Sequence, residues 1–154
     1  MELGDYLNGS HLIDYHNQAL KSDDVVKLLE RFGLEVIYRF DRLSEGTPDA
    51  YSVSAESEGF ELRFDEHQTL ETLWCYIRKR GSFSPIEPDC IGVFIPDSLA
   101  AARRHAKSGG HPSQEGGSES AKAYVRIDGP RASVHYEFDK GKLSLVTIMR
   151  PWED

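Results

Sequence analysis

Cysteine is scarce in this chain: Cys75 and Cys90 are the only two among 154 residues. Two cysteines do not make the disulfide framework that small secreted domains depend on. A bridge between them is geometrically conceivable, but a buried free thiol in a reducing compartment explains each one more simply. We therefore expect a cytoplasmic protein.

Long apolar runs are also missing. No stretch approaches the roughly 20 apolar residues of a membrane-spanning helix. The N-terminus, MELGDYLNG, lacks the basic start and the apolar core of a signal peptide. The net charge of −8 leaves no basic stripe for a phosphate backbone. We expect neither a membrane nor a nucleic acid as partner.

The negative charge is spread unevenly along the chain. Residues 1–76 hold 16 acids against 6 bases, a balance of −10, whereas residues 77–154 hold 10 acids against 12 bases. Such an excess is typical of a solvated surface that aids solubility. It is equally typical of a lobe that steers toward a basic partner.

Motifs of catalysis and metal binding are absent. There is no G-x-S-x-G elbow, the glycines at 109–110 and 116–117 lie in no strand–helix turn, and the carboxylates follow no calcium-loop spacing. His11, Asp14 and His16 match no strong ligand pattern. We predict no catalytic residue, no metal and no cofactor. One exception stays open, because Ser133, His135 and Glu137 alternate along one strand face, where an acid/base site is conceivable.

The most informative stretch runs from residue 59 to residue 79. Residues 60–64 alternate between apolar and charged side chains, which predicts a strand with one dry face. Residues 70–77 are apolar on both alternating sets: Leu73, Cys75 and Ile77 on one, and Leu70, Trp74 and Tyr76 on the other. Such a strand lies inside a sheet that is covered on both faces, or covered on one face and bound to a partner on the other.

The remaining pattern predicts an α+β fold, an antiparallel sheet built from hairpins with two main helices. We expect one domain over residues 1–154, with a flexible loop at about 108–120 that cannot bury itself. Two similar units, each a helix followed by a hairpin, suggest a diverged duplication, although shared turn chemistry would explain them equally. The expected helices span 22–33 and 99–107, and the expected strands span 34–40, 51–55, 60–64, 70–77, 91–95, 121–128, 131–138 and 143–149.

A family resemblance is carried by GFELRFD (59–65), LETLWCYI (70–77), IPDSL (95–99), VHYEFD (134–139) and LSLVTIM (143–149). This arrangement resembles small cytoplasmic immunity proteins of bacterial polymorphic-toxin and type VI secretion systems. In those families a strand ending in Phe-Asp, a polar turn and an L-x-x-Φ strand recur on both sides of a helix. The resemblance implies a protein without catalytic residues that binds a cognate toxin and neutralises it.

The expected binding surface is acidic and lies in the N-terminal half. A basic toxin, such as a nuclease whose cleft attracts phosphate, fits that charge. Two alternatives remain: an adaptor or chaperone that binds an effector without inhibiting it, or a small enzyme with a site near His135 and Glu137, together with His67. The pattern specifies no oligomeric state. The residues expected to contact the partner are Glu56, Glu58, Glu61, Asp65, Glu66, Glu71, Trp74 and Tyr76.

Overall fold

The fold was examined in a computed structural model, which describes residues 2–40 and 45–151. Its helical elements are α1 (Glu2–Leu7), the 3-10 turn η1 (Leu12–Tyr15), α2 (Asp23–Phe32), the 3-10 turn η2 (Pro88–Cys90) and α3 (Leu99–Ser108). The strands are β1 (Ile37–Arg39), β2 (Ala50–Ala55), β3 (Phe60–Phe64), β4 (Leu70–Tyr76), β5 (Ser113–Gly117), β6 (Lys122–Asp128), β7 (Ser133–Asp139) and β8 (Lys142–Met149). Within the described ranges, no helix has the length and apolar character needed to cross a membrane.

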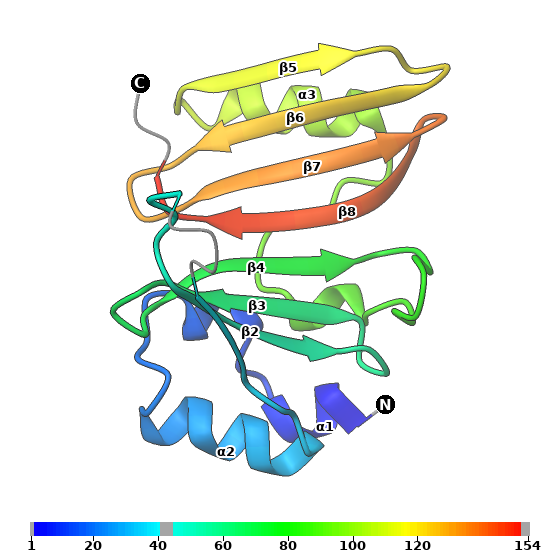
Figure 1. The fold of residues 1–154 in the computed structure, drawn as a ribbon. Coiled ribbons are helices and arrows are strands. Elements are labelled where there is room, and N and C mark those ends of the chain that lie inside the picture. Colours follow the sequence, from blue (N-terminus) through cyan, green and yellow to red (C-terminus); the bar gives the residue numbers. More distant parts are fainter. Residues whose placement is uncertain (1, 41–44, 152–154) are drawn as a thin grey trace.

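All eight strands form one antiparallel sheet in the order β1-β2-β3-β4-β8-β7-β6-β5. Each half is a helix followed by a four-stranded meander, and the halves join where β4 pairs with β8 (Figure 1). The predicted α+β class is confirmed, with β4 at the centre of the sheet as its two apolar sets indicated.

The strand pairing of the first half resembles that of the second half. Leu73 pairs with Ile148 and Cys75 with Val146 around the central pair of Trp74 and Thr147. The β3–β4 and β7–β8 hairpins each carry a register shift directly before a Phe, Phe64 or Phe138, and Glu71 and Ser144 are the residues left unpaired. The strand pairing is therefore close to two-fold symmetric about the middle of the sheet.

Both main helices begin at a serine cap. The Ser22 hydroxyl accepts a hydrogen bond from the Val25 amide, and the Ser98 hydroxyl accepts one from the Ala101 amide. Gly33 ends α2 in the left-handed region, with φ of 62°, which a residue without Cβ adopts at little cost. These caps satisfy amides that the first turn of a helix leaves without partners.

One face of the sheet packs against the helices. Val25 and Leu28 of α2, with Leu99 and Ala102 of α3, belong to the same buried cluster as the inward-facing strand residues. In Figure 1, α3 lies behind β5 and β6. The fully buried strand side chains include Phe60, Leu62, Phe64, Leu73, Cys75, Tyr136, Phe138 and Ile148.

Four expectations need correction. Leu70 shares the buried cluster with Leu73, because the bulge at Glu71 shifts the alternation by one residue. Residues 108–120 are not all loop, since Ser113–Gly117 forms the edge strand β5 by backbone pairing that needs no apolar side chain. Residues 91–95 form no strand, because Gly92 turns the chain at φ of 92°. The 34–40 pattern pairs only over Ile37–Arg39.

Candidate functional site

The face of the sheet turned away from the helices, here called the open face, carries the polar and aromatic side chains. The helices thus cover one of the two faces of β4, while Thr72, Tyr76, Leu145 and Thr147 on the other face of the sheet are buried by their neighbours. In the first half, the open face presents Ser52, Glu61, Arg63, Thr72, Trp74 and Tyr76, and in the second half it presents Tyr124, His135, Glu137, Leu145 and Thr147.

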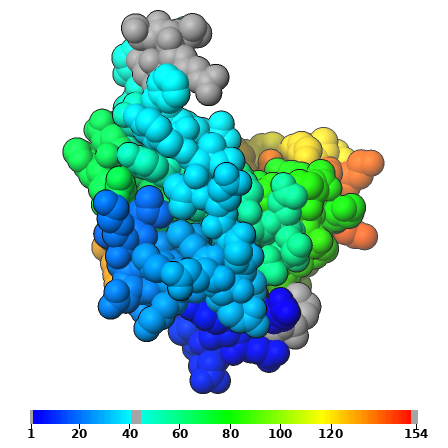
Figure 2. Space-filling model, turned by 60° about the horizontal axis from the view of Figure 1, so that its bottom comes forward, coloured from blue at the N-terminus to red at the C-terminus, as the bar shows by residue number. Residues whose placement is uncertain are grey.

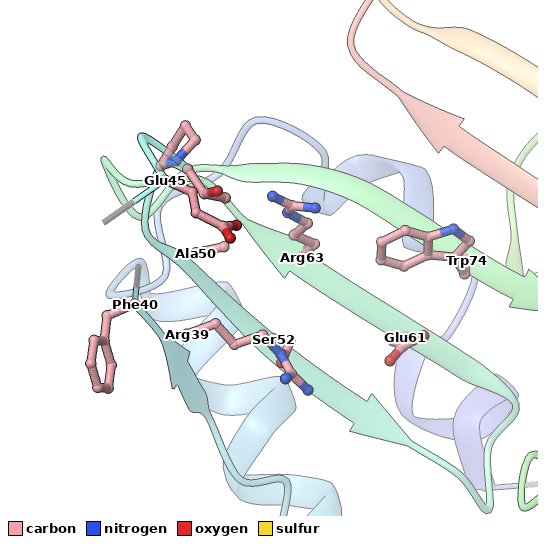
Figure 3. A pocket seen from close by; sticks show the side chains of 10 residues that line it. Arg39, Phe40, Glu45, Ala50, Ser52, Glu61, Arg63 and Trp74 are labelled. Atoms are coloured by element: carbon pink, nitrogen blue, oxygen red, sulfur yellow. The ribbon is translucent and has the colours of Figure 1, made fainter. Parts of the chain in front are cut away.

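A hollow of about 460 Å³ lies on the open face of the first half (Figure 3). Trp74 of β4 forms one wall, with Glu61 and Arg63 of β3 beside it, and the loop before β2 closes another side. In Figure 3 the Phe40 ring points away from the other labelled side chains. The lining residues are Arg39, Phe40, Glu45, Thr47, Pro48, Ala50, Ser52, Glu61, Arg63 and Trp74.

The carboxylate of Glu61 is already engaged. It accepts hydrogen bonds from the Tyr76 hydroxyl at 3.1 Å and from the Ser54 hydroxyl at 3.2 Å. Burial raises the pKa of Tyr76 to about 12, helped by the nearby Glu61 charge, so the phenol keeps the proton that it donates. Glu61 is held in one orientation and is poorly placed to act as a general base.

The two arginines of the hollow make fewer hydrogen bonds than Glu61 does. Arg39 Nε donates to the neutral Ser52 hydroxyl at 3.0 Å. For Arg63, no hydrogen bond or ion pair joins it to another residue within 2–40 and 45–151. The hollow thus combines an aromatic wall with guanidinium groups that can form new bonds, a set that is common at the centre of protein interfaces.

Tyr76 lies close to the hollow but is only 8% exposed. Its ring stacks on Phe83 with centroids 4.3 Å apart, and the Arg80 guanidinium lies 5.8 Å from the ring centroid. Arg80 also pairs with Glu137 at 2.8 Å. Tyr76 therefore positions Glu61 and anchors the loop after β4, which leaves Trp74 as the more accessible aromatic.

A second, shallower hollow occupies the matching position in the other half. It measures about 370 Å³ and is lined by Gly117, Lys122, Ala123, Tyr124, His135 and Glu137. The rings of Tyr124 and His135 stack with centroids 5.2 Å apart. Burial lowers the pKa of His135, opposed by Glu137 and aided by Arg126. The side chains of this second hollow already have partners: Tyr124 and His135 stack on each other, and Glu137 pairs with Arg80.

The acids expected to bind the partner do not form one patch. Glu56 and Glu58 lie in the β2–β3 turn, whereas Asp65 and Glu66 lie in the β3–β4 turn at the opposite end of β3. Asp65 accepts from the amides of His67 and Thr69 at 2.9 and 3.0 Å and pairs with Arg150, so it holds the turn. Of the predicted residues, the open face brings together Glu61, Trp74 and Tyr76.

Sequence reasoning missed Arg39, Ser52 and Arg63. Each is one of the polar residues in an alternating strand pattern, and such residues are normally expected to face solvent. The loop residues Thr47 and Pro48 carried only a turn signal. Strand pairing brings these positions beside Trp74.

The three residues of the suggested enzyme site share a strand face but have separate contacts. The Ser133 hydroxyl donates to Asp128 at 2.9 Å, His135 stacks on Tyr124, and Glu137 pairs with Arg80. His67 is 80% exposed in the β3–β4 turn, 3.6 Å from Glu66. Among the described residues, no group of three or more His, Cys, Asp or Glu side chains is placed to hold a metal ion.

Both cysteines are free and buried, as expected. Burial raises the pKa of Cys75 to about 12 and, with the Glu87 hydrogen bond, that of Cys90 to about 11. A thiol that keeps its proton is a poor nucleophile.

Comparison with known proteins gives one similarity. The chain is 29% identical over 133 residues to the transposon Tn917 resolvase of Enterococcus faecalis, a match that covers 83% of this chain and 72% of the resolvase. No protein-family model and no solved structure matches the chain.

Proposed function

We propose that this chain is a cytoplasmic immunity protein that binds a cognate secreted toxin and neutralises it, with the hollow around Trp74 as its central contact. The observation that carries the proposal is a half-buried tryptophan beside Arg63, whose guanidinium bonds no other residue of the described ranges, on a sheet face without helices. Trp and Arg are the side chains most enriched among the residues that dominate binding energy. The immunity-like hairpins support the same reading.

Charge supports a basic toxin, such as a nuclease. Acids lie in the turns at both ends of β3, and the half to which they belong carries a balance of −10. Such a field speeds the approach of a cationic partner and weakens with salt. The rim acids then govern the association rate, while Trp74 governs the lifetime of the complex.

Catalysis is the less favoured function. The acid in the hollow accepts hydrogen bonds from Tyr76 and Ser54. His135 stacks on Tyr124 and Glu137 pairs with Arg80, so these two residues contact different partners. A net charge of −8 opposes contact with a phosphate backbone, so the charge does not favour a DNA-binding function like that of a resolvase.

The test is co-expression with the product of the adjacent gene in a sensitive host, followed by binding measurements with Trp74→Ala. We expect the wild-type chain to protect the host and Trp74→Ala to raise Kd by roughly 30-fold or more, as for an interface hot spot. The control is Phe94→Ala, which removes an aromatic 44% exposed that lines neither hollow. Its Kd should stay within about threefold of wild type, as expected for a contact outside the interface.

Charge reversal of Glu56, Glu58 and Glu66 together should slow association at low salt and leave dissociation nearly unchanged. If the adjacent product is harmless alone, or kills despite excess of this chain, the immunity function is excluded. Binding without protection would favour the adaptor. Absence of binding would favour the enzyme, with His135→Ala as its first variant.

A further inference from the structure

The edge strand β1 exposes an unusual amount of apolar surface. Val36, Ile37, Tyr38 and Phe40 are 36, 47, 50 and 52% exposed, and they make up four of the six exposed large hydrophobic residues in the described chain. Figure 2 shows the cyan segment that contains β1 at the surface above α2. Natural proteins usually protect such an edge, because its free backbone groups pair readily with another strand.

The segment is also longer than the strand it forms. Residues 34–40 alternate as a strand of seven, but only Ile37–Arg39 pair with β2. The three residues before Ile37 have strand-like sequence and lack a strand partner within the described chain. Pairing on the outer side of β1 would complete the strand.

The sequence of the segment, LEVIYRF, is complementary to itself when two copies run antiparallel about Ile37. Glu35 then lies opposite Arg39 of the other copy, and Val36 lies opposite Tyr38, each pair occurring twice. Opposite charges and aromatic–β-branched pairs are the favourable cross-strand combinations. Ile37 meets its own copy at the centre. Leu34 takes no part, because its side chain packs against the core and its amide donates to the Leu29 carbonyl.

Side-chain contacts with β2 and the loop before it order the edge strand. Tyr38 stacks on Tyr51 with ring centroids 5.1 Å apart, and its hydroxyl donates to Asp49 at 2.6 Å. Arg39 Nε donates to the Ser52 hydroxyl, and pairing with Glu35 of the other copy would use the terminal nitrogens of the guanidinium. A strand already ordered by its inner neighbour loses less entropy on docking.

We propose that two copies of this chain pair through β1, antiparallel and centred on Ile37, to form one continuous sheet across a two-fold axis. The occupant is a second copy because the charges match only in this self-complementary register. Such an interface is isologous and closes at two subunits. A contact of one short strand per copy is small, so the dimer should be weak and concentration-dependent.

Sedimentation velocity on the full chain tests the proposal, and we expect dimer to appear over roughly 10–300 µM, the range of a small interface. Glu35→Arg places two arginines opposite each other and should raise the dimer Kd about tenfold or more. The double variant Glu35→Arg with Arg39→Glu exchanges the charges and should restore the wild-type Kd. Because the rescue depends on register, a merely structural effect of either change would not produce it.

A cysteine probe checks the register independently. Ile37→Cys should form an oxidised dimer, because the two copies of residue 37 face each other. Tyr38→Cys should not, because the two copies of residue 38 lie about two residues apart along the strands, beyond disulfide reach. The native cysteines are buried and do not compete.

A chain that stays monomeric over this range, or a double variant that fails to rescue, overturns the proposal. If Ile37→Glu abolishes toxin binding while the wild type remains monomeric, the edge pairs with the toxin and not with itself. Glu35 lies outside the Trp74 hollow, so loss of dimer in Glu35→Arg with toxin binding intact separates this inference from the proposed function.

Discussion

At the residue scale, His16 connects three distant parts of the chain. Its ring Nε2 lies 2.9 Å from the carbonyl oxygen of Glu71, the bulge residue of β4. A carbonyl can only accept, so this nitrogen carries the proton. Glu71 in turn lies 3.8 Å from Arg150, which follows β8.

The acid sensitivity of folding should depend on His16. Burial lowers its pKa, Arg150 lowers it further, and the Glu71 carbonyl opposes both. As pH falls below about 6.5, the unfolded chain takes up a proton that the folded chain resists, so stability decreases toward the folded pKa. Between pH 7.5 and 5.5, the melting temperature of His16→Gln should therefore fall less than that of the wild type, since an amide can still donate to Glu71.

The matched control for this measurement is His67→Gln, on a side chain 80% exposed. Its melting temperature should follow the wild-type pH dependence. An equal pH dependence in His16→Gln and wild type would show that other groups cause the acid sensitivity.

At the element scale, β5 shows how little side-chain signal a strand needs. Its sequence is SQEGG, yet it pairs with β6 along its whole length and places Gly116 against the Tyr124 ring. Any side chain at Gly116 would bring its Cβ within 2.7 Å of that ring. Glu115 adds an ion pair to Arg103 of α3 at 3.4 Å.

Replacing residues 109–120 with a short Gly-Ser linker should lower the melting temperature by about 4–8 °C, equivalent to about 2 kcal/mol for a chain of this length. The loss arises because β6 becomes an edge strand and Tyr124 loses its packing against Gly116. Differential scanning calorimetry measures it. A change below about 1 °C, small on the same scale, would mean that β5 contributes nothing to stability.

At the scale of the whole molecule, the two halves share one core. Val53, Leu62 and Leu73 from the first half belong to the same buried cluster as Val125, Tyr136 and Val146 from the second. Arg80 and Arg150 add ion pairs across the β4–β8 junction, to Glu137 and Asp65. The halves should therefore unfold together.

Leu73→Ala tests this coupling at the junction, where Leu73 is fully buried and pairs with Ile148. We expect a loss of roughly 2–5 kcal/mol in a single urea transition that far-UV and near-UV circular dichroism report identically. Two separate transitions would show that the halves are independent, and a loss below ~1 kcal/mol, less than a core cavity costs, would show that the strand is not central.

Local patterns determined much of the fold. The two helices, the two hairpins and the inner position of β4 follow from side-chain period, serine caps and turn glycines, all of which act over a few residues. The same patterns were misleading at Leu70 and over 91–95, because a bulge and a positive φ at Gly92 are local backbone events that the alternation does not show.

The candidate site needed the tertiary structure. The sequence pattern predicted Trp74 and Glu61 as contact residues, but Arg39, Ser52 and Arg63 meet Trp74 only because β1, β2, β3 and β4 pair side by side. Likewise, the acids between Glu56 and Glu71 are close in sequence and lie at opposite ends of a strand. A strand separates neighbours in sequence by more than 3 Å per residue and brings distant segments within about 5 Å. For this reason the sequence determined the kinds of residue present, and strand pairing alone decided which of them share a surface.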